Sequence, residues 1–252
     1  MNFKIIINEI KDLVEEVFFP HARRAIIRSN RYYGNLKIMQ IRAALHLAKI
    51  DLVVDVGANS GQFGMEMRRI GFEGLLLSFE PGVDAFQQLS RNAKDDKLWK
   101  VFNYALGAEN KQAVFQIYHD SRLNSFLEGN NESSTRFKDK FNFGQEATIP
   151  IKRLDTVWPE IAVKKSDAIF LKLDTQGYDL EVYKGIGYLK GSVDYILIEL
   201  SIIPIYKNML SYIEVLKFFE TEGYLPLAFF PVTRHSDNTI IEFDCLMKKK
   251  IM

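Results

Sequence analysis

Cysteine is nearly absent from this sequence, in which Cys245 is the single cysteine among 252 residues. One cysteine excludes an intrachain disulfide framework and a metal site built from several cysteine ligands. Cys245 lies in a predicted strand, where we expect it to be a small core residue. The four histidines show no H-x-x-x-H spacing, and no carboxylates cluster at metal-ligand spacing, so we expect no metal ion.

An excess of charge and a long hydrophobic run are also missing. The chain has 33 basic and 32 acidic residues, and its net charge of +1 predicts no attraction to nucleic acid or another polyanion. No apolar run approaches the length that crosses a bilayer. Polar residues interrupt the start of the chain too early for a signal peptide, at Lys4, Asn8, Glu9, Lys11 and Asp12. We therefore expect a soluble cytoplasmic protein.

The strongest local pattern is the stretch from Leu52 to Gly61, with the sequence LVVDVGANSG. A short β-branched run that contains Asp55 leads into a glycine-containing turn and then an amphipathic stretch, which predicts a strand, a tight turn and a helix. Gly57 and Gly61 permit a sharp turn and a close approach of a ligand to the backbone. The helix would direct its N-terminal amides at that ligand.

A second predicted strand, residues 74–79, leads into Glu80 and Pro81. An acid here, about 20 residues past the glycine turn, is positioned to accept hydrogen bonds from both hydroxyls of a ribose. A dinucleotide site would require G-x-G-x-x-G, whereas Asn59 falls near the place of a second glycine. Asp55 would repel a pyrophosphate but suit an ammonium group. These features favour S-adenosylmethionine (SAM), which has a ribose, an amine and a sulfonium but no phosphate, over a nicotinamide or flavin cofactor.

Strand and helix patterns alternate along the rest of the chain, which predicts a mostly parallel, doubly wound α/β sheet. The third strand, within residues 99–107, exits at Ala105 and Leu106, which we expect near the adenine. The last two strands, about 224–230 and 239–247, have no helix between them and predict an antiparallel hairpin at one edge.

Two further segments accompany this core, which we assign to residues 51–252. Residues 1–50 predict an N-terminal helical extension of two helices, the first ended by Pro20. Between them lies a basic stretch with Arg23, Arg24, Arg28 and Arg31. We interpret it as a solvated cap, with a homodimer interface or contact with membrane head groups as alternatives. Residues 120–146 form the most polar segment and predict a lid, a substrate loop or a disordered loop. Its isolated aromatics and amides would suit a sugar.

The strand near residues 168–174 should lie beside the first strand, where the winding of the sheet reverses and ligands bind. Lys172 and Asp174 lie two residues apart and therefore project to one face. A lysine in a central strand is costly unless paired, so we expect a cluster of Lys172, Asp174 and Glu199. In this cluster Asp174 would bind the acceptor hydroxyl or take its proton; alternatively, the cluster only fixes the local geometry. His119, at the start of the polar segment, is the alternative base.

Four stretches resemble the FkbM-type SAM-dependent methyltransferases. They are DVGANSG at 55–61, FEP at 79–81, ALG at 105–107 and FLKLDTQGYDLEVYKG at 170–185. The last is the most specific, because the first two occur in many methyltransferases. The resemblance covers roughly residues 50–250.

The resemblance implies a Rossmann-like class I methyltransferase sheet and O-methylation, often of a sugar hydroxyl in a glycan, glycolipid or secondary metabolite. It also implies that Gly57 and Glu80 bind SAM and that Lys172 and Asp174 belong to the active-site side. Many members have a glutamate where this chain has Gln176. If that glutamate acts as a base or a ligand, its role falls to Asp174 here.

The predicted function is therefore a SAM-dependent O-methyltransferase that acts on a sugar hydroxyl. The alternatives are a methyltransferase of another small-molecule hydroxyl or amine, and an inactive SAM-fold partner protein. The chain has no Asn/Asp-Pro-Pro-aromatic run for a flipped base, which argues against nucleic-acid methylation. The candidate residues are Asp55, Gly57, Asn59, Gly61, Glu80, Pro81, Ala105 and Leu106 for the cofactor, Gln176 and Glu199 for the substrate, and Asp174, Lys172 and His119 for catalysis.

Overall fold

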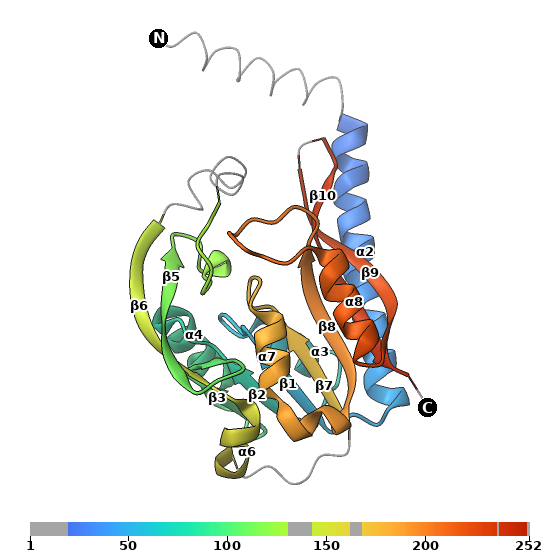
Figure 1. The fold of residues 1–252 in the computed structure, drawn as a ribbon. Helices are drawn as coiled ribbons and strands as arrows, with labels where there is room; N and C mark the ends of the chain where they lie inside the picture. Colours follow the sequence, from blue (N-terminus) through green and yellow to red (C-terminus); the bar gives the residue numbers. More distant parts are fainter. Residues whose placement is uncertain (1–19, 131–142, 162–167, 236, 251–252) are drawn as a thin grey trace.

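The main sheet of the computed structural model has seven strands in the order β3-β2-β1-β7-β8-β10-β9. The structure describes residues 20–130, 143–161, 168–235 and 237–250 (Figure 1). Five strands run parallel: β1 (Leu52–Val56), β2 (Leu75–Phe79), β3 (Trp99–Phe102), β7 (Ile169–Leu173) and β8 (Val193–Ser201). At one edge β10 (Ile240–Lys249) is antiparallel to both β8 and β9 (Tyr224–Arg234). The predicted class I methyltransferase sheet with its antiparallel edge hairpin is confirmed.

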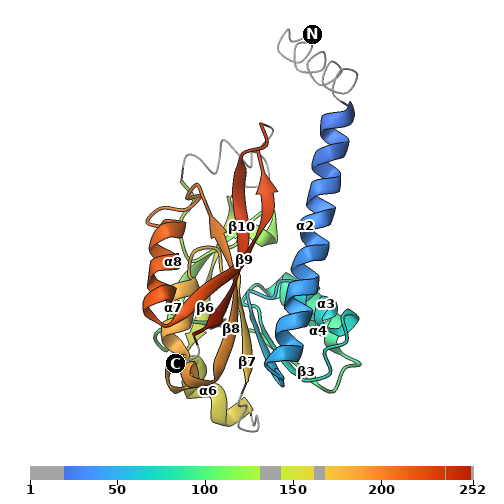
Figure 2. The ribbon, with the colours of Figure 1, turned by 90° about the vertical axis from the view of Figure 1, so that its right-hand side faces the viewer.

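Helices cover both faces of this sheet (Figure 2). One face carries α2 (Pro20–Leu47), α3 (Gln62–Arg69) and α4 (Val83–Ala93). The other carries α6 (Leu154–Ile161), α7 (Asp179–Gly185), the 3-10 turn η3 (Gly187–Ser192) and α8 (Tyr212–Thr221). Because strands with helices on both faces are buried on both sides, their sequences are continuous apolar runs rather than alternating ones.

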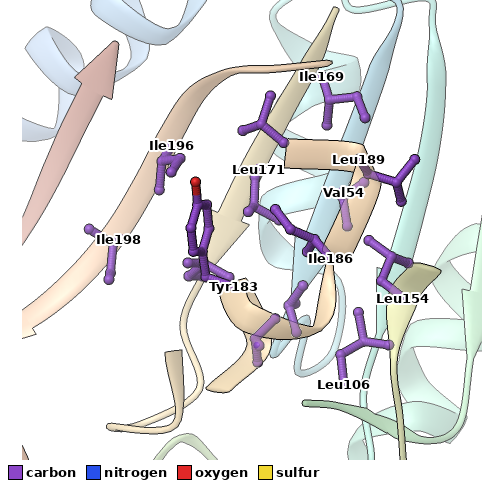
Figure 3. Close-up of a cluster of buried hydrophobic side chains, with 14 of the residues drawn as sticks. Val54, Leu106, Leu154, Ile169, Leu171, Tyr183, Ile186, Leu189, Ile196 and Ile198 are labelled. Carbon is purple, nitrogen blue, oxygen red and sulfur yellow. The ribbon is translucent and has the colours of Figure 1, made fainter. Parts of the chain in front are cut away.

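The central strand β1 shows how the two layers of the core are built. Val54 packs with Leu171 of β7 and Tyr183 of α7 in the cluster drawn in Figure 3. Neighbouring side chains along a strand point to opposite faces, so Val53 packs on the other face of the sheet, in the cluster that contains Met67 of α3. Asp55, which follows Val54 in this strand, is 0% exposed, so its carboxyl requires a partner inside the protein.

A second, three-stranded sheet was not predicted. It consists of β4 (Ala105–Leu106), β6 (Phe143–Lys152) and β5 (Lys111–Tyr118), in that order. The predicted third strand is therefore split: β3 ends at Phe102, and β4 pairs instead with residues 151–152 of β6. This pairing places the small sheet beside the ends of the main strands.

The beginning of the polar segment is folded against the body of the protein. Residues 121–123 form the 3-10 turn η1 (Ser121–Leu123), and Leu123 is buried with Tyr206. Ser125 is 0% exposed, and its hydroxyl donates to the backbone oxygen of Gln176 at 2.9 Å. Residues 131–142 of this segment lie outside the described residues.

Pro20 is the first residue of α2, and whether it also ends a preceding helix, as predicted, lies outside the described residues. Proline suits the first turn of a helix because its missing N–H has no partner there. The four arginines predicted to lie between two helices are therefore part of α2, and the helix predicted before them lies outside the described residues. Further along, Ile41, Ala44 and Leu45 are buried against the main sheet. No helix in the described ranges is long and apolar enough to cross a membrane.

Candidate active site

The carboxyl ends of β1, β2 and β7 open into a cavity, at the point where the winding of the sheet reverses. We call it the strand-end cavity. Most of the predicted site residues line it: Gly57, Asn59, Glu80, Pro81, Ala105, Leu106, Asp174, Gln176 and Glu199. The fold thus brings together residues that are up to 142 positions apart in the sequence, from Gly57 to Glu199.

The turn after β1 is packed directly against the exit of β7. Gly57 has a φ of +75°, and a Cβ there would collide with the backbone oxygen of Asp174. The backbone N–H of Asp174 donates to Val56 O at 3.1 Å, and those of Gly57 and Ala58 each donate to Phe79 O at 3.0 Å. Glycine is therefore required by both the conformation and the close contact. The turn is fixed between the two neighbouring strands.

Glu80 is positioned by this turn. Its Oε2 accepts a hydrogen bond from the backbone N–H of Asn59 at 2.8 Å, and its Oε1 accepts one from that of Gly82 at 2.8 Å. Asn59 itself has a φ of 47°, which asparagine tolerates better than most residues. Burial raises the pKa of Glu80 to about 7, although the two amide donors oppose this. Each carboxylate oxygen keeps a lone pair, so Glu80 can accept two more hydrogen bonds, as from a ribose.

A buried charged cluster lies beneath the turn. Lys172 Nζ is 3.1 Å from Asp55 Oδ1 and 3.3 Å from Asp174 Oδ2, and it donates to Gly57 O at 3.2 Å. Asp55 and Lys172 are opposite each other on β1 and β7, and the Ser78 hydroxyl donates to Asp55 Oδ2 at 3.2 Å. Burial raises the pKa of Asp55, and the ammonium of Lys172 opposes that rise. Burial disfavours the charge on Lys172, but the carboxyl groups of Asp55 and Asp174 outweigh it and raise the pKa of this lysine.

The prediction that Glu199 pairs with Lys172 was wrong. Gln176 Nε2 donates instead to Glu199 Oε1 at 2.8 Å and to Asp174 Oδ1 at 3.3 Å, so one amide connects both carboxyl groups. Gln176 has a φ of +53°, an uncommon conformation for a residue other than glycine. Burial, followed by the nearby carboxyl of Asp174, raises the pKa of Glu199 well above its ordinary value. The register between β1 and β7 places Asp55 opposite Lys172, so this lysine pairs with Asp55 and not with Glu199.

Besides Lys172, three of the candidate residues do not line the strand-end cavity. Asp55 lies inside β1, is 0% exposed and faces Lys172. A Cβ at Gly61 would clash with Leu89 of α4 and Trp99 of β3. The close approach that this glycine permits is therefore to these two elements of the protein. His119 is exposed just past the end of β5. Roles in binding or catalysis for these three stay predictions.

Sequence reasoning missed the side of the cavity formed by the second sheet and the segment after it. That side is lined by Phe115, Ser121, Arg122, Asn124, Phe126 and Tyr178. Four of these fall in the polar segment, 120–146, whose composition indicated a lid or binding loop. Phe115 gave no signal, because it is one aromatic residue in an ordinary strand pattern, and Tyr178 was part of the 170–185 stretch but was not singled out.

Comparison with known proteins agrees with this architecture. Residues 55–226 match the Methyltransferase FkbM domain. The chain is 30% identical over 156 residues to methyltransferase sdnD from Sordaria araneosa, a match that covers 53% of this chain and 60% of that protein. The chain therefore belongs to the FkbM methyltransferase family, and its match spans three fifths of the length of this curated relative.

Solved structures of similar shape are distant in sequence. The magnesium protoporphyrin IX methyltransferase of Synechocystis PCC 6803 is 11% identical, with 96% of each chain covered and a TM-score of 0.48. The precorrin-6y C5,15-methyltransferase of Geobacter metallireducens is 12% identical, with 84% of this chain and 88% of that chain covered and a TM-score of 0.44. Similarity at this level carries no information about substrate.

The substitution Lys172→Met tests the buried cluster. It leaves Asp55 buried without its cation, which we expect to lower the free energy of unfolding by about 3–5 kcal/mol. The loss should be larger at pH 8 than at pH 5, because a carboxyl whose folded-state pKa is raised destabilises the fold as it ionises. Urea unfolding monitored by circular dichroism measures both effects.

Two further variants control this experiment. Lys184→Met removes a lysine from an exposed pair with Glu181 and should change stability by no more than about 0.5 kcal/mol. Adding Asp55→Asn to Lys172→Met removes the stranded charge and should restore part of the loss. A double variant no more stable than Lys172→Met at pH 8 would contradict the assignment.

Proposed function

We propose that this chain is a SAM-dependent O-methyltransferase that acts on a sugar hydroxyl. The observation that carries the cofactor assignment is the carboxyl of Glu80, which is held by two backbone amides beside the Gly57 turn and lines the strand-end cavity. Family membership supports the reaction class. Acid and amide groups near the exit of β7 support an acceptor that carries hydroxyls.

The residues present fit this cofactor. Glu80 would accept the two ribose hydroxyls, and Pro81 and Leu106 offer apolar surface to an adenine. At Gly57, where a Cβ would meet Asp174 O, the backbone itself forms the wall of the cavity. The carboxyl groups of Glu80, Asp174 and Glu199 line the cavity and suit a ligand that carries a positive charge. The described residues form no glycine-rich loop of the kind that binds a pyrophosphate. SAM supplies a methyl group that is already activated, so the protein mainly orients the reactants, which contributes on the order of 7–11 kcal/mol.

Asp174 is the proposed base. Its carboxyl lines the strand-end cavity at the exit of β7, and Lys172 and Gln176 fix one oxygen each. In the proposed step the acceptor oxygen forms a bond to the methyl carbon while the carbon–sulfur bond breaks, and sulfur keeps the electron pair. The hydroxyl proton passes to Asp174. Lys172 stays protonated throughout and orients the base.

Binding of S-adenosylhomocysteine, the demethylated product, tests Glu80. Ionised Glu80 accepts the ribose hydroxyls better than the protonated acid does, so the dissociation constant should fall by up to about tenfold between pH 6 and pH 8 and level off above. Glu80→Gln should bind more weakly and lose this pH dependence, as measured by isothermal titration calorimetry.

The matched control for this titration is Glu109→Gln, which changes an exposed glutamate outside the cavity. It should bind S-adenosylhomocysteine like the wild type at every pH. A folded wild-type protein that does not bind S-adenosylhomocysteine would contradict the proposed function and favour an inactive partner protein. Unchanged binding in Glu80→Gln would contradict the role of Glu80 alone.

Asp174→Asn tests the proposed base. The substitution removes the proton acceptor but keeps the shape of the side chain, so S-adenosylhomocysteine affinity should be nearly unchanged. Turnover should fall by roughly tenfold or more, since a general base typically contributes about 10² to 10⁴. Release of S-adenosylhomocysteine from SAM in the presence of methyl glycosides, measured by mass spectrometry, reports turnover. Full turnover in the variant would exclude Asp174 as the base.

A further inference from the structure

A second cleft adjoins the strand-end cavity on the side of α2, and we call it the α2 cleft. Four residues of α2 line it, namely Gly34, Lys37, Ile38 and Ile41. Their spacing of three, four and seven residues places them on one face of the helix. The α2 cleft shares residues with the strand-end cavity, namely Gly57, Asn59, Arg122, Asp174 and Glu199. The two spaces therefore meet at the turn after β1 and at the proposed base.

Both charged and apolar side chains line the α2 cleft. Lys37 Nζ lies 2.7 Å from Asp244 Oδ2, so an ion pair joins α2 to β10 at this cleft. The charged residues that line the cleft are Lys37, Arg122, Lys172, Glu66, Asp174, Glu199 and Asp244. The apolar ones include Ile41, Phe63, Leu197 and Val232. The cleft thus offers hydrogen-bond donors, acceptors and apolar surface within one space.

Gly34 keeps one side of the α2 cleft open. Glycine within a helix is destabilising by roughly 0.5–1 kcal/mol relative to alanine. A Cβ at Gly34 would meet no atom within 4 Å, and its φ is not positive, so neither packing nor backbone conformation requires glycine here. Its missing side chain leaves space on the helix face that lines the cleft.

We propose that the α2 cleft is the binding site of the methyl acceptor and that it is built for a sugar. This inference rests on the proposed function. An apolar acceptor would bury charged groups without hydrogen bonds, which is costly. A polyanion would meet four carboxyl groups, those of Glu66, Asp174, Glu199 and Asp244. Sugar hydroxyls both donate to carboxylates and accept from lysine and arginine, while the ring carbons contact the apolar wall. A hydroxyl at the inner end would lie beside Asp174.

The substitution Gly34→Leu tests the proposal because it fills the cleft from a position that faces open space. The probes are S-adenosylhomocysteine, titrated by calorimetry, and the methyl glycosides of glucose, galactose, mannose and rhamnose, detected by saturation-transfer NMR on the S-adenosylhomocysteine complex. We expect at least tenfold weaker binding of the glycoside that the wild type binds best. S-adenosylhomocysteine affinity should stay within about twofold of wild type.

Three other variants complete the design. Gly34→Ala adds a single carbon and should weaken glycoside binding less than Gly34→Leu does. Arg42→Ala changes a basic residue of α2 that lines a different cavity, so it should keep glycoside binding. Lys37→Gln keeps a hydrogen-bond donor at this position but removes the charge, and it should weaken glycoside binding several-fold. It also serves as the test if Gly34→Leu does not fold.

The outcomes separate this inference from the proposed function. Loss of S-adenosylhomocysteine binding in Gly34→Leu would assign the α2 cleft to the cofactor and overturn the acceptor site. Unchanged glycoside binding in both Gly34→Leu and Lys37→Gln would also overturn it. Failure of every glycoside to bind a wild-type protein that binds S-adenosylhomocysteine would overturn the sugar class. A wild type that binds no S-adenosylhomocysteine would instead contradict the cofactor assignment on which the proposed function rests.

Discussion

The ion pair between Lys172 and Asp55 joins the two central strands of the main sheet, and the geometry of the site depends on it. Both side chains are buried, and each would be costly without the other. The same ammonium reaches Gly57 O and Asp174 Oδ2, so one cation fixes the turn after β1 and the exit of β7 together. The ion pair that compensates these two buried charges therefore also places the proposed base beside the turn proposed to bind the cofactor.

A series of backbone contacts extends from this pair to the rest of the site. The Gly57 turn touches the backbone of Asp174 on one side and is hydrogen-bonded to Phe79 on the other. The backbone N–H of Asn59, within the turn, donates a hydrogen bond to Glu80. The proposed ribose-binding acid and the proposed base are thus positioned by the same short turn, so we expect little adjustment when a ligand enters. Fixed geometry of this kind suits methyl transfer, in which alignment contributes most of the rate.

Local patterns predicted the parts of the site that depend on local geometry. The β1 strand, its glycine turn and Glu80 were predicted because apolar runs, glycines and the distance to the next strand are visible along the chain. The pairing of Lys172 with Asp55 was not predicted. The sequence shows which acids are present, but it does not show the strand register that places Asp55 opposite Lys172. The second sheet was missed because β4 has two residues, and its pairing with β6 crosses more than 40 positions. Such pairing leaves no periodicity to detect.

The most direct test of the account is a crystal structure of the chain with S-adenosylhomocysteine. We expect the adenosine in the strand-end cavity, with the ribose hydroxyls within hydrogen-bond distance of both Glu80 carboxylate oxygens and the sulfur directed at Asp174. We also expect Lys172 to keep its contacts with Asp55 and Asp174. A ligand bound away from Glu80, or a Lys172 that leaves Asp55 to bind the ligand, would contradict the central claim.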